Sequence, residues 1–277
     1  MAAEKRAEEE GGVSKMQIKL IENNSKTGKM SFMLKDSTPA FANTLRRAII
    51  DMVPTMAIET VEFAQNSSVL YDEMIAHRLG LFVLSTDLKS YNIPSKCSCK
   101  GKGCAKCTLK LVLKAKGPGT VYASDMKSKD PKVKPVFPKT VVAKLLKDQE
   151  IELVATAILG KGNEHSKWSP GHVHYSYLPN VTVNNDSKNF EEFKNKYPPQ
   201  AFDKSGKLSK TLIIENNLID ACDEVCEDVV KIDYDKTGFI FHVESWGQLD
   251  PVTMVNEAID ALNEDLDEFA KKLSKLK

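Results

Sequence analysis

Gly160-Lys-Gly-Asn-Glu-His-Ser-Lys-Trp-Ser-Pro170 restricts the fold of this chain more than any other stretch of its sequence. Its two glycines permit left-handed backbone or the close approach of another segment, and Pro170 restricts the way out of the turn. Trp168 is a large amphipathic side chain in a strongly polar setting, as in many anchors of protein interfaces. We therefore expect a recognition loop in which Trp168 binds a partner. The alternative is a surface turn with Trp168 folded back on its own domain.

A second restrictive stretch is Asp72-Glu-Met-Ile-Ala-His-Arg-Leu-Gly-Leu81. Gly80 suits a C-terminal cap, and the basic residues before it complement the helix dipole. The sequence therefore predicts a helix that leads into a strand. Glu73 and His77 stand four residues apart, which indicates a pair on one helix face rather than a catalytic dyad. The apolar face of this helix is predicted to hold Met74, Ile75, Leu79 and Leu81.

Both stretches resemble one protein family, which contains the D subunit of archaeal DNA-directed RNA polymerase, the bacterial alpha subunit N-terminal domain and the eukaryotic third-largest polymerase subunit. The first is similar to a loop shared by the archaeal and eukaryotic members. The second is similar to a helix-to-strand junction that is also present in bacterial alpha. The resemblance covers roughly Gln17 to Leu273. It implies an α+β fold with a split dimerisation domain, an inserted β-rich domain and a degenerate ferredoxin-like module.

The order of strand-rich, polar and acidic segments along the chain is similar to the order of domains in this family. Strand patterns with glycine and proline turns dominate after Pro54, and an acidic segment follows a polar linker. We expect four segments: the first part of the dimerisation domain (13–53), the inserted β-rich domain with a Cys-rich zinc loop (54–180), the degenerate ferredoxin-like module (187–236), and the second part of the dimerisation domain with its C-terminal helix (237–277).

The first segment predicts a hairpin and a helix. Met16–Glu22 and Met30–Leu34 flank a polar turn, and Thr38 can cap a helix that begins near Pro39. Arg46 and Arg47 lie off its apolar face, and the resemblance places them where bacterial alpha touches the large catalytic subunits. We expect both to bind a partner, and the alternative is a solvated helix face. The predicted apolar face is Phe41, Leu45, Ala48, Ile49 and Met52.

Four cysteines lie within eleven residues, in Cys97-Ser-Cys99-Lys-Gly-Lys-Gly-Cys104-Ala-Lys-Cys107. Four thiolates suit tetrahedral Zn²⁺, and the flanking lysines offset the net negative charge of such a centre. The spacing resembles the zinc loop of the eukaryotic third subunit, although some archaeal relatives lack a filled site. We predict that Cys97, Cys99, Cys104 and Cys107 bind one Zn²⁺. The alternative is four free surface thiols left from a lost site.

Two further cysteines, Cys222 and Cys226, raise the question of an iron–sulfur cluster. Many archaeal members of the family carry a ferredoxin-like module between the two parts of the first domain. Counted back from Cys226, the bacterial ferredoxin spacing places only Cys222 and Cys226 at ligand positions. We predict a degenerate module without a cluster, filled by apolar side chains, in which both cysteines are buried helix residues. The other ligand positions fall on Asn216, Ile219, Phe190, Phe193 and Tyr197.

The composition is that of a globular protein, with 42% hydrophobic and 28% charged residues and a formal net charge of +1. Residues 1–12 are polar without a leader-like apolar region, and no stretch approaches 18 apolar residues, so we expect a cytoplasmic protein that binds no membrane. Residues 96–147 contain fourteen lysines and two acidic residues. This segment has no arginine and few aromatics, so we expect DNA contact to be indirect.

The last predicted helix, from about Pro251 to Leu273, carries apolar residues at alternating intervals of three and four. This is the pattern of a seam between two helices, although a core helix can also show it. We expect a partner-binding helix because the first domain has few elements to cover so long a stripe. The seam consists of Val252, Val255, Ile259, Leu262, Leu266, Phe269 and Leu273.

The resemblance implies the function of a non-catalytic assembly subunit of archaeal DNA-directed RNA polymerase. Such a subunit pairs with the small subunit L and holds the large catalytic subunits together with the small zinc-binding subunits N and P. The sequence shows no acidic metal-binding triad for nucleotidyl transfer, so we expect no catalytic site in this chain. The alternatives are an iron–sulfur or zinc-binding redox protein and a zinc-dependent nucleic-acid-binding protein.

Overall fold

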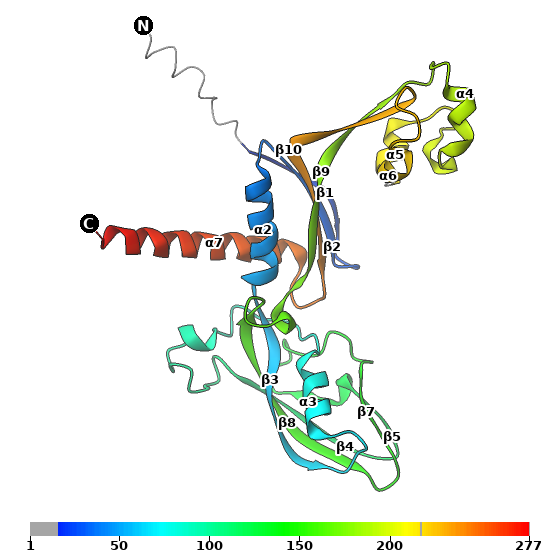
Figure 1. Cartoon of the computed structure of the whole chain (residues 1–277). Coiled ribbons are helices and arrows are strands. Elements are labelled where there is room, and N and C mark those ends of the chain that lie inside the picture. Colours follow the sequence, from blue (N-terminus) through cyan, green and yellow to red (C-terminus); the bar gives the residue numbers. More distant parts are fainter. Residues whose placement is uncertain (1–15, 217, 277) are drawn as a thin grey trace. The chain divides into compact units, whose positions relative to one another are not determined.

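The computed structural model describes residues 16–216 and 218–276. Helices and strands are mixed along the chain, and the strands form two four-stranded sheets and one two-stranded sheet (Figure 1). The α+β class expected from the sequence is confirmed. The prediction that residues 1–12 carry no leader lies outside the described residues.

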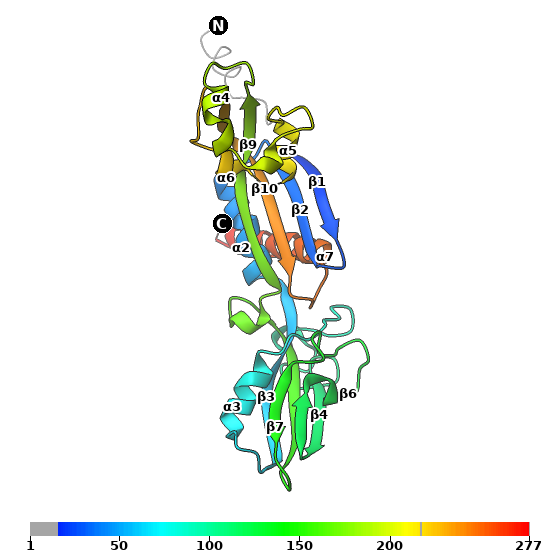
Figure 2. The same ribbon diagram turned by 90° about the vertical axis from the view of Figure 1, so that its right-hand side faces the viewer.

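The first sheet joins segments from distant parts of the sequence. Strands β1 (Gln17–Asn24) and β2 (Lys29–Lys35) form the predicted hairpin, whose turn ends at Gly28 with a φ of 68°. The sheet order is β1-β2-β10-β9, with β10 spanning Val230–Ser245 and β9 spanning Gly171–Val183 (Figure 2). Strand β9 therefore runs through residue 180, where the sequence predicted the end of the inserted domain.

One face of this sheet is apolar because buried residues alternate along its central strands. Phe32 on β2 stacks on Phe241 of β10, with ring centroids 4.9 Å apart and planes 3° from parallel. Tyr175 of β9 contacts the same Phe241 ring, with centroids 5.4 Å apart. The residues that β2 and β10 bury on this face are Met30, Phe32, Leu34, Phe239, Phe241 and Val243.

Helix α2 (Pro39–Asp51) begins as predicted, because the Phe41 backbone N–H donates to the Thr38 hydroxyl at 3.2 Å. Its buried face differs from the predicted one at two positions, Phe41 and Met52, of which Met52 follows the helix and is half-buried. Phe41 is exposed and Ala42 is completely buried in its place, together with Leu45, Ala48 and Ile49. The first turn of the helix therefore presents a small residue inward, which the apolar spacing alone did not reveal.

The second sheet has the order β3-β8-β4-β6. Strand β3 (Pro54–Asn66) pairs antiparallel with β8 (Glu150–Lys161) along its whole length, from Pro54 opposite Lys161 to Asn66 opposite Ile151. Strand β4 (Leu109–Lys116) pairs with the other edge of β8 and with the short β6 (Lys127–Ser128). A separate pair is formed by β5 (Gly119–Tyr122) and β7 (Val141–Leu145), of which β7 was not predicted.

The strand predicted to follow helix α3 (Asp72–Gly80) is reduced to a single bridge between Leu84 and Pro135. Backbone hydrogen bonds flank the bridge, from the Ser85 N–H to the Lys134 carbonyl and from the Val136 N–H to the Val83 carbonyl, each at 2.9 Å. Gly80 is the last residue of helix α3, and Leu81 is its C-cap residue, contrary to the predicted glycine cap. Leu81 and Met74 are exposed, so the buried face of α3 consists only of Ile75 and Leu79.

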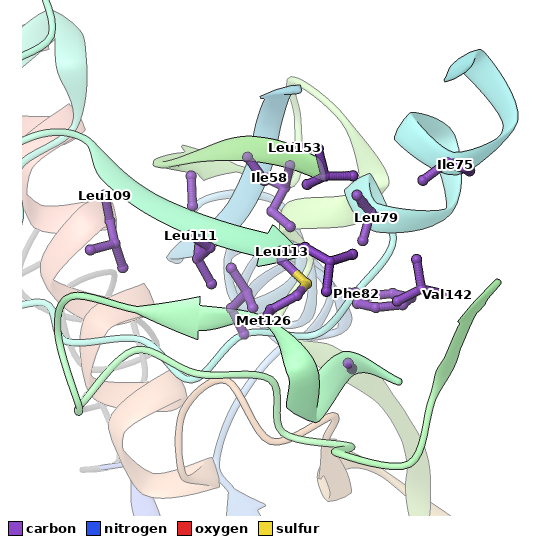
Figure 3. Packing of buried hydrophobic residues seen from close by; sticks show 14 of the residues in the cluster. Ile58, Ile75, Leu79, Phe82, Leu109, Leu111, Leu113, Met126, Val142 and Leu153 are labelled. Atoms are coloured by element: carbon purple, nitrogen blue, oxygen red, sulfur yellow. The ribbon is translucent and has the colours of Figure 1, made fainter. Parts of the chain in front are cut away.

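Alternating leucines of β4 form the centre of the core beneath this sheet. Figure 3 shows Leu109, Leu111 and Leu113 in line, with Leu153 of β8 nearby. Ile75 and Leu79 of α3 belong to the same buried cluster. At roughly 1.5–3 kcal/mol for each large side chain, this burial stabilises the inserted domain.

Residues 187–229 form a small helical module with its own core. It contains α4 (Phe190–Phe193), α5 (Lys210–Glu215) and α6 (Ile219–Cys222). Cys226 lies outside α6 and is only half-buried, although the sequence predicted a buried helix residue. Asn216 is exposed. All the other residues at the ferredoxin ligand positions, Cys226 included, belong to one apolar cluster, which contains Phe190, Phe193, Tyr197, Ile219, Cys222 and Cys226.

We predict that this module binds no iron, because apolar side chains fill its centre and only two thiols stand at ligand positions. Protein purified under anaerobic conditions is expected to be colourless and to contain iron far below one atom per chain. As a control, a Cys222→Ala variant should show the same iron content. A brown protein with stoichiometric iron would contradict the prediction.

Candidate metal centre and partner-binding surfaces

The loop from Gly160 to Pro170 packs its tryptophan inward. Trp168 is only 5% exposed, and a Cβ added at Gly160 would overlap its indole ring. The Lys167 ammonium lies 4.3 Å from the centroid of the same ring, donates to the Ile58 carbonyl at 3.1 Å and pairs with Glu59. The missing side chain at Gly160 therefore creates the space that the indole ring occupies.

The same loop caps the C-terminal end of α2. The Asn163 backbone N–H donates to the Asp51 carbonyl at 3.1 Å, and the Ser169 hydroxyl donates to the Ile50 carbonyl at 3.2 Å. Gly162 approaches so closely that a Cβ there would overlap the Ile50 oxygen. The last carbonyls of a helix have no partner within the helix, so this loop satisfies them.

The structure buries the Trp168 ring within its own domain, and partner binding by this loop stays a prediction. The ring has almost no surface to offer, because it faces Gly160 and lies under Lys167. The alternative of a tryptophan folded back on its own domain is the one observed. The Thr55 hydroxyl donates to the Trp168 carbonyl at 2.6 Å. The two residues are 113 positions apart in the sequence, and no local pattern predicted this contact.

We predict that Gly160→Ala destabilises the chain by about 1–3 kcal/mol, because the added methyl group overpacks the site of the indole ring. Gly119→Ala is the matched control, since a Cβ there meets nothing within 4 Å. Urea unfolding of both variants should show a lowered midpoint only for Gly160→Ala. Equal midpoints would contradict the packing described for Trp168.

The four cysteines of residues 97–107 converge on one point. The Sγ atoms of Cys97 and Cys104 lie 3.5 Å apart, those of Cys99 and Cys107 also 3.5 Å, and those of Cys104 and Cys107 3.8 Å. All four sulfurs lie within 4.8 Å of one another. A tetrahedral Zn²⁺ with bonds of about 2.3 Å places its sulfurs about 3.8 Å apart, so these residues fit that ion.

The backbone of the loop explains why the thiols can converge. Lys100, Gly101 and Gly103 adopt positive φ angles of 55°, 78° and 82°, which reverse the chain between the two cysteine pairs. Glycine adopts these angles without strain. The Cys104 backbone N–H donates to the Cys107 sulfur at 3.3 Å, as in sites where amide groups stabilise thiolates.

Protonation of the thiols is uneven. Burial raises the pKa of Cys107 to about 12, although the Cys104 backbone N–H acts in the opposite direction. Burial also disfavours the charged form of Cys99, but hydrogen bonds from the Cys107 and Cys97 thiols outweigh it and lower its pKa to about 6. A metal ion that binds all four thiolates must therefore displace a proton from Cys107 at neutral pH.

We predict that the chain holds one Zn²⁺ and that its affinity for Zn²⁺ rises with pH through the neutral range, since protons compete for the thiolates. Zinc release to a colorimetric chelator, measured at several pH values, tests this dependence. Cys104→Ser with Cys107→Ser should lose the metal, whereas Cys222→Ser should retain it. Less than a few tenths of a zinc per chain in protein purified without chelator would contradict the prediction.

Asp250 caps the start of helix α7 (Pro251–Ser274), because its carboxylate accepts a hydrogen bond from the Thr253 backbone N–H at 3.0 Å. The residues it buries are Pro251, Met254 and Ala258, none of which belongs to the predicted seam. Along that seam, Val255 and Leu262 are half-buried, and Val252, Ile259, Leu266, Phe269 and Leu273 are exposed. The most exposed are Leu266 and Phe269, at 64% and 63%. The chain thus leaves this apolar stripe uncovered in its described part.

Arg46 and Arg47 lie on α2 with their side chains toward the surface. Arg46 donates to the Asn43 carboxamide oxygen at 2.9 and 3.2 Å and is half-buried. Arg47 is exposed and lies 3.7 Å from Asp51, one turn further along the helix. Both guanidinium groups retain donors for a further partner.

Within residues 16–216 and 218–276, no helix combines the length and the hydropathy that are needed to span a bilayer.

The inserted domain and the whole chain both match known proteins. Residues 57–174 match the family model described as "RNA polymerase Rpb3/RpoA insert domain". DNA-directed RNA polymerase subunit Rpo3 of Methanopyrus kandleri is 34% identical over 254 residues, which cover 88% of this chain and 91% of the relative. The Rpo3 subunit of Methanosarcina acetivorans is 34% identical, with 94% and 99% covered, and that of Pyrococcus furiosus is 33% identical, with 94% and 98% covered.

Proposed function

Because this chain belongs to the family of DNA-directed RNA polymerase subunit Rpo3, we propose that it is a non-catalytic assembly subunit of that polymerase. Its dimerisation domain consists of the first sheet with α2 and α7, and it pairs with the small subunit L. The pair is the platform on which the large catalytic subunits assemble. The four reduced thiols of the zinc loop suit the cytoplasm, where we propose that assembly takes place.

The uncovered seam of α7 is the observation that carries this proposal. Five large apolar residues of one helix face lie in water, although the same helix buries Met254 and Ala258 on another face. Burying each seam residue would contribute roughly 1.5–3 kcal/mol before the cost of association. A facing helix with matching apolar residues supplies that burial, as in other helix–helix seams.

The remaining surfaces suit further subunits of the complex. Arg46 and Arg47 offer guanidinium groups for carboxylates of a large catalytic subunit. The zinc loop and its lysines lie on the inserted domain, where we propose that subunits N and P bind. Among the described residues, the four cysteines suit Zn²⁺ rather than the Mg²⁺ used in nucleotidyl transfer, and no group of carboxylates that could hold a metal ion occurs. We therefore assign that chemistry to the large subunits and propose that DNA contact is indirect.

We predict that Leu262→Asp with Leu266→Asp abolishes co-purification with subunit L, because two buried carboxylates would replace apolar contacts in the seam. Co-expression with a tagged subunit L, followed by affinity capture, measures the loss. The zinc content of the variant should stay unchanged, since neither residue is one of the four cysteines that we propose as metal ligands.

Lys271→Asp is the matched control for this variant. It makes the same change in net charge. Its side chain lies on the exposed end of α7, on nearly the opposite side of the helix axis from Leu262 and Leu266. We expect it to co-purify with subunit L normally. If the unmodified chain were a monodisperse monomer that did not bind subunit L, the proposal would be wrong.

A second prediction concerns the two arginines. Arg46→Ala with Arg47→Ala should leave the pair with subunit L intact and should weaken recruitment of the large catalytic subunits, because bidentate donors are lost. Stepwise reconstitution, followed by size-exclusion chromatography, separates the two steps. Lys26→Ala with Lys35→Ala, on the hairpin, is a control for loss of charge alone. Normal recruitment by the arginine variant would remove these residues from the interface.

A further inference from the structure

Three of the five histidines gather on one face of the first sheet, at a place that no sequence pattern had singled out. His172 and His174 alternate along β9, and His242 lies on the neighbouring β10 (Figure 1). The rings of His174 and His242 stack, with centroids 4.9 Å apart and planes 20° from parallel. The centroids of the His172 and His174 rings are 5.4 Å apart. The sheet therefore holds three imidazoles in one continuous row.

This face is the open one. Val173, Phe241 and Val243 alternate with the histidines and are buried on the opposite face, as strand geometry requires. His172 and His174 are exposed, and His242 is half-buried. The three rings thus line a surface that a small solute can reach, rather than filling the core.

The surroundings of His242 are those of a metal ligand. Its Nδ1 lies 2.9 Å from the Ser31 hydroxyl, which occupies this nitrogen and leaves Nε2 free. Ligating histidines commonly have their second nitrogen held by such a hydrogen bond, because it fixes the ring and its tautomer. Ser31 lies on β2, 211 positions away in the sequence, so only the folded sheet brings the two together.

A carboxylate also lies near the row of imidazoles. Glu244, two positions after His242 on β10, acts electrostatically on His174. Its carboxylate lies 3.5 Å from the Lys29 ammonium.

We propose that His172, His174 and His242 form a second metal site, which binds one divalent transition-metal ion such as Zn²⁺, Ni²⁺ or Cu²⁺ through imidazole nitrogens. Two histidines at alternate positions of one strand and a third on the adjacent strand can supply three nitrogens to one ion. In this structure the nitrogens of the three rings do not point to one position, so the exposed His172 and His174 side chains must rotate for all three to bind one ion. Three protein ligands leave coordination positions open for water or a carboxylate.

Ni²⁺ is the probe of choice, because imidazole suits it and the thiol loop can be filled beforehand with Zn²⁺. The untagged full chain, alone or paired with subunit L, is loaded with Zn²⁺, freed of excess metal and titrated with Ni²⁺ by calorimetry at neutral pH. Elemental analysis afterwards measures whether zinc stays bound. We expect one Ni²⁺ per chain in addition to the retained zinc.

Single-histidine variants decide where this ion binds. His172→Ala removes an exposed ring that folding does not require, and it should weaken Ni²⁺ binding about ten-fold or more, as should His174→Ala. His77→Ala, on α3 of the inserted domain, is the matched control and should bind as the unmodified chain does. The Leu262→Asp with Leu266→Asp variant should also bind Ni²⁺ normally, which separates this site from partner binding.

Two results would overturn the proposal. One is the absence of any Ni²⁺ binding beyond exchange with the zinc of the thiol loop. The other is an affinity that His172→Ala and His174→Ala leave unchanged while His77→Ala reduces it. In the spectra of the imidazole protons, Ni²⁺ should broaden the signals of His174 and His242 and spare those of His77.

Discussion

The contact between the Trp168 ring and Gly160 is the constraint on which the centre of this chain depends. The ring fixes the turn after β8, and the turn places Asn163 and Ser169 against the last carbonyls of α2. The Gln248 carboxamide donates to the Ser169 carbonyl at 3.0 Å, and the Trp246 N–H donates to the Pro170 carbonyl at 3.1 Å. One indole ring thus holds together the end of a helix, the beginning of β9 and the end of β10. Each buried carbonyl left without a donor would cost about 1–3 kcal/mol, so these hydrogen bonds help to fix the conformation of the loop.

Few contacts within the protein hold the loop of the four cysteines. Its ion pair with α7, between Lys96 and Glu264 at 2.6 Å, is largely exposed and therefore screened by solvent. The left-handed residues of the loop, Lys100, Gly101 and Gly103, reverse the chain and are exposed. A metal ion on the four thiols would supply the order that packing does not. The second sheet, with the buried leucines of β4 at its centre, is instead stabilised by its apolar core.

Helix α7 differs between its two halves. Its first turns are held by the Asp250 cap and by Met254 and Ala258, which are buried, whereas no residue after Leu262 is buried in the described part. The second half buries no apolar side chain, and its apolar seam is costly to leave in water. The structure of this chain is therefore consistent with a subunit whose final packing includes a partner.

The sequence by itself determined what local patterns encode. The hairpin, α2, α3, α7 and the clustering of four cysteines follow from periodicity, caps and spacing within a few residues, because these features depend on neighbours in the chain. Tertiary structure alone decided the direction of Trp168, the place of β9 in the first sheet and the row of three histidines. Each of these depends on segments far apart in sequence: Trp168 on Thr55, and His242 on Ser31. A local pattern specifies which face of an element is apolar, but not which distant residue that face meets, because that choice is made by packing of the whole chain.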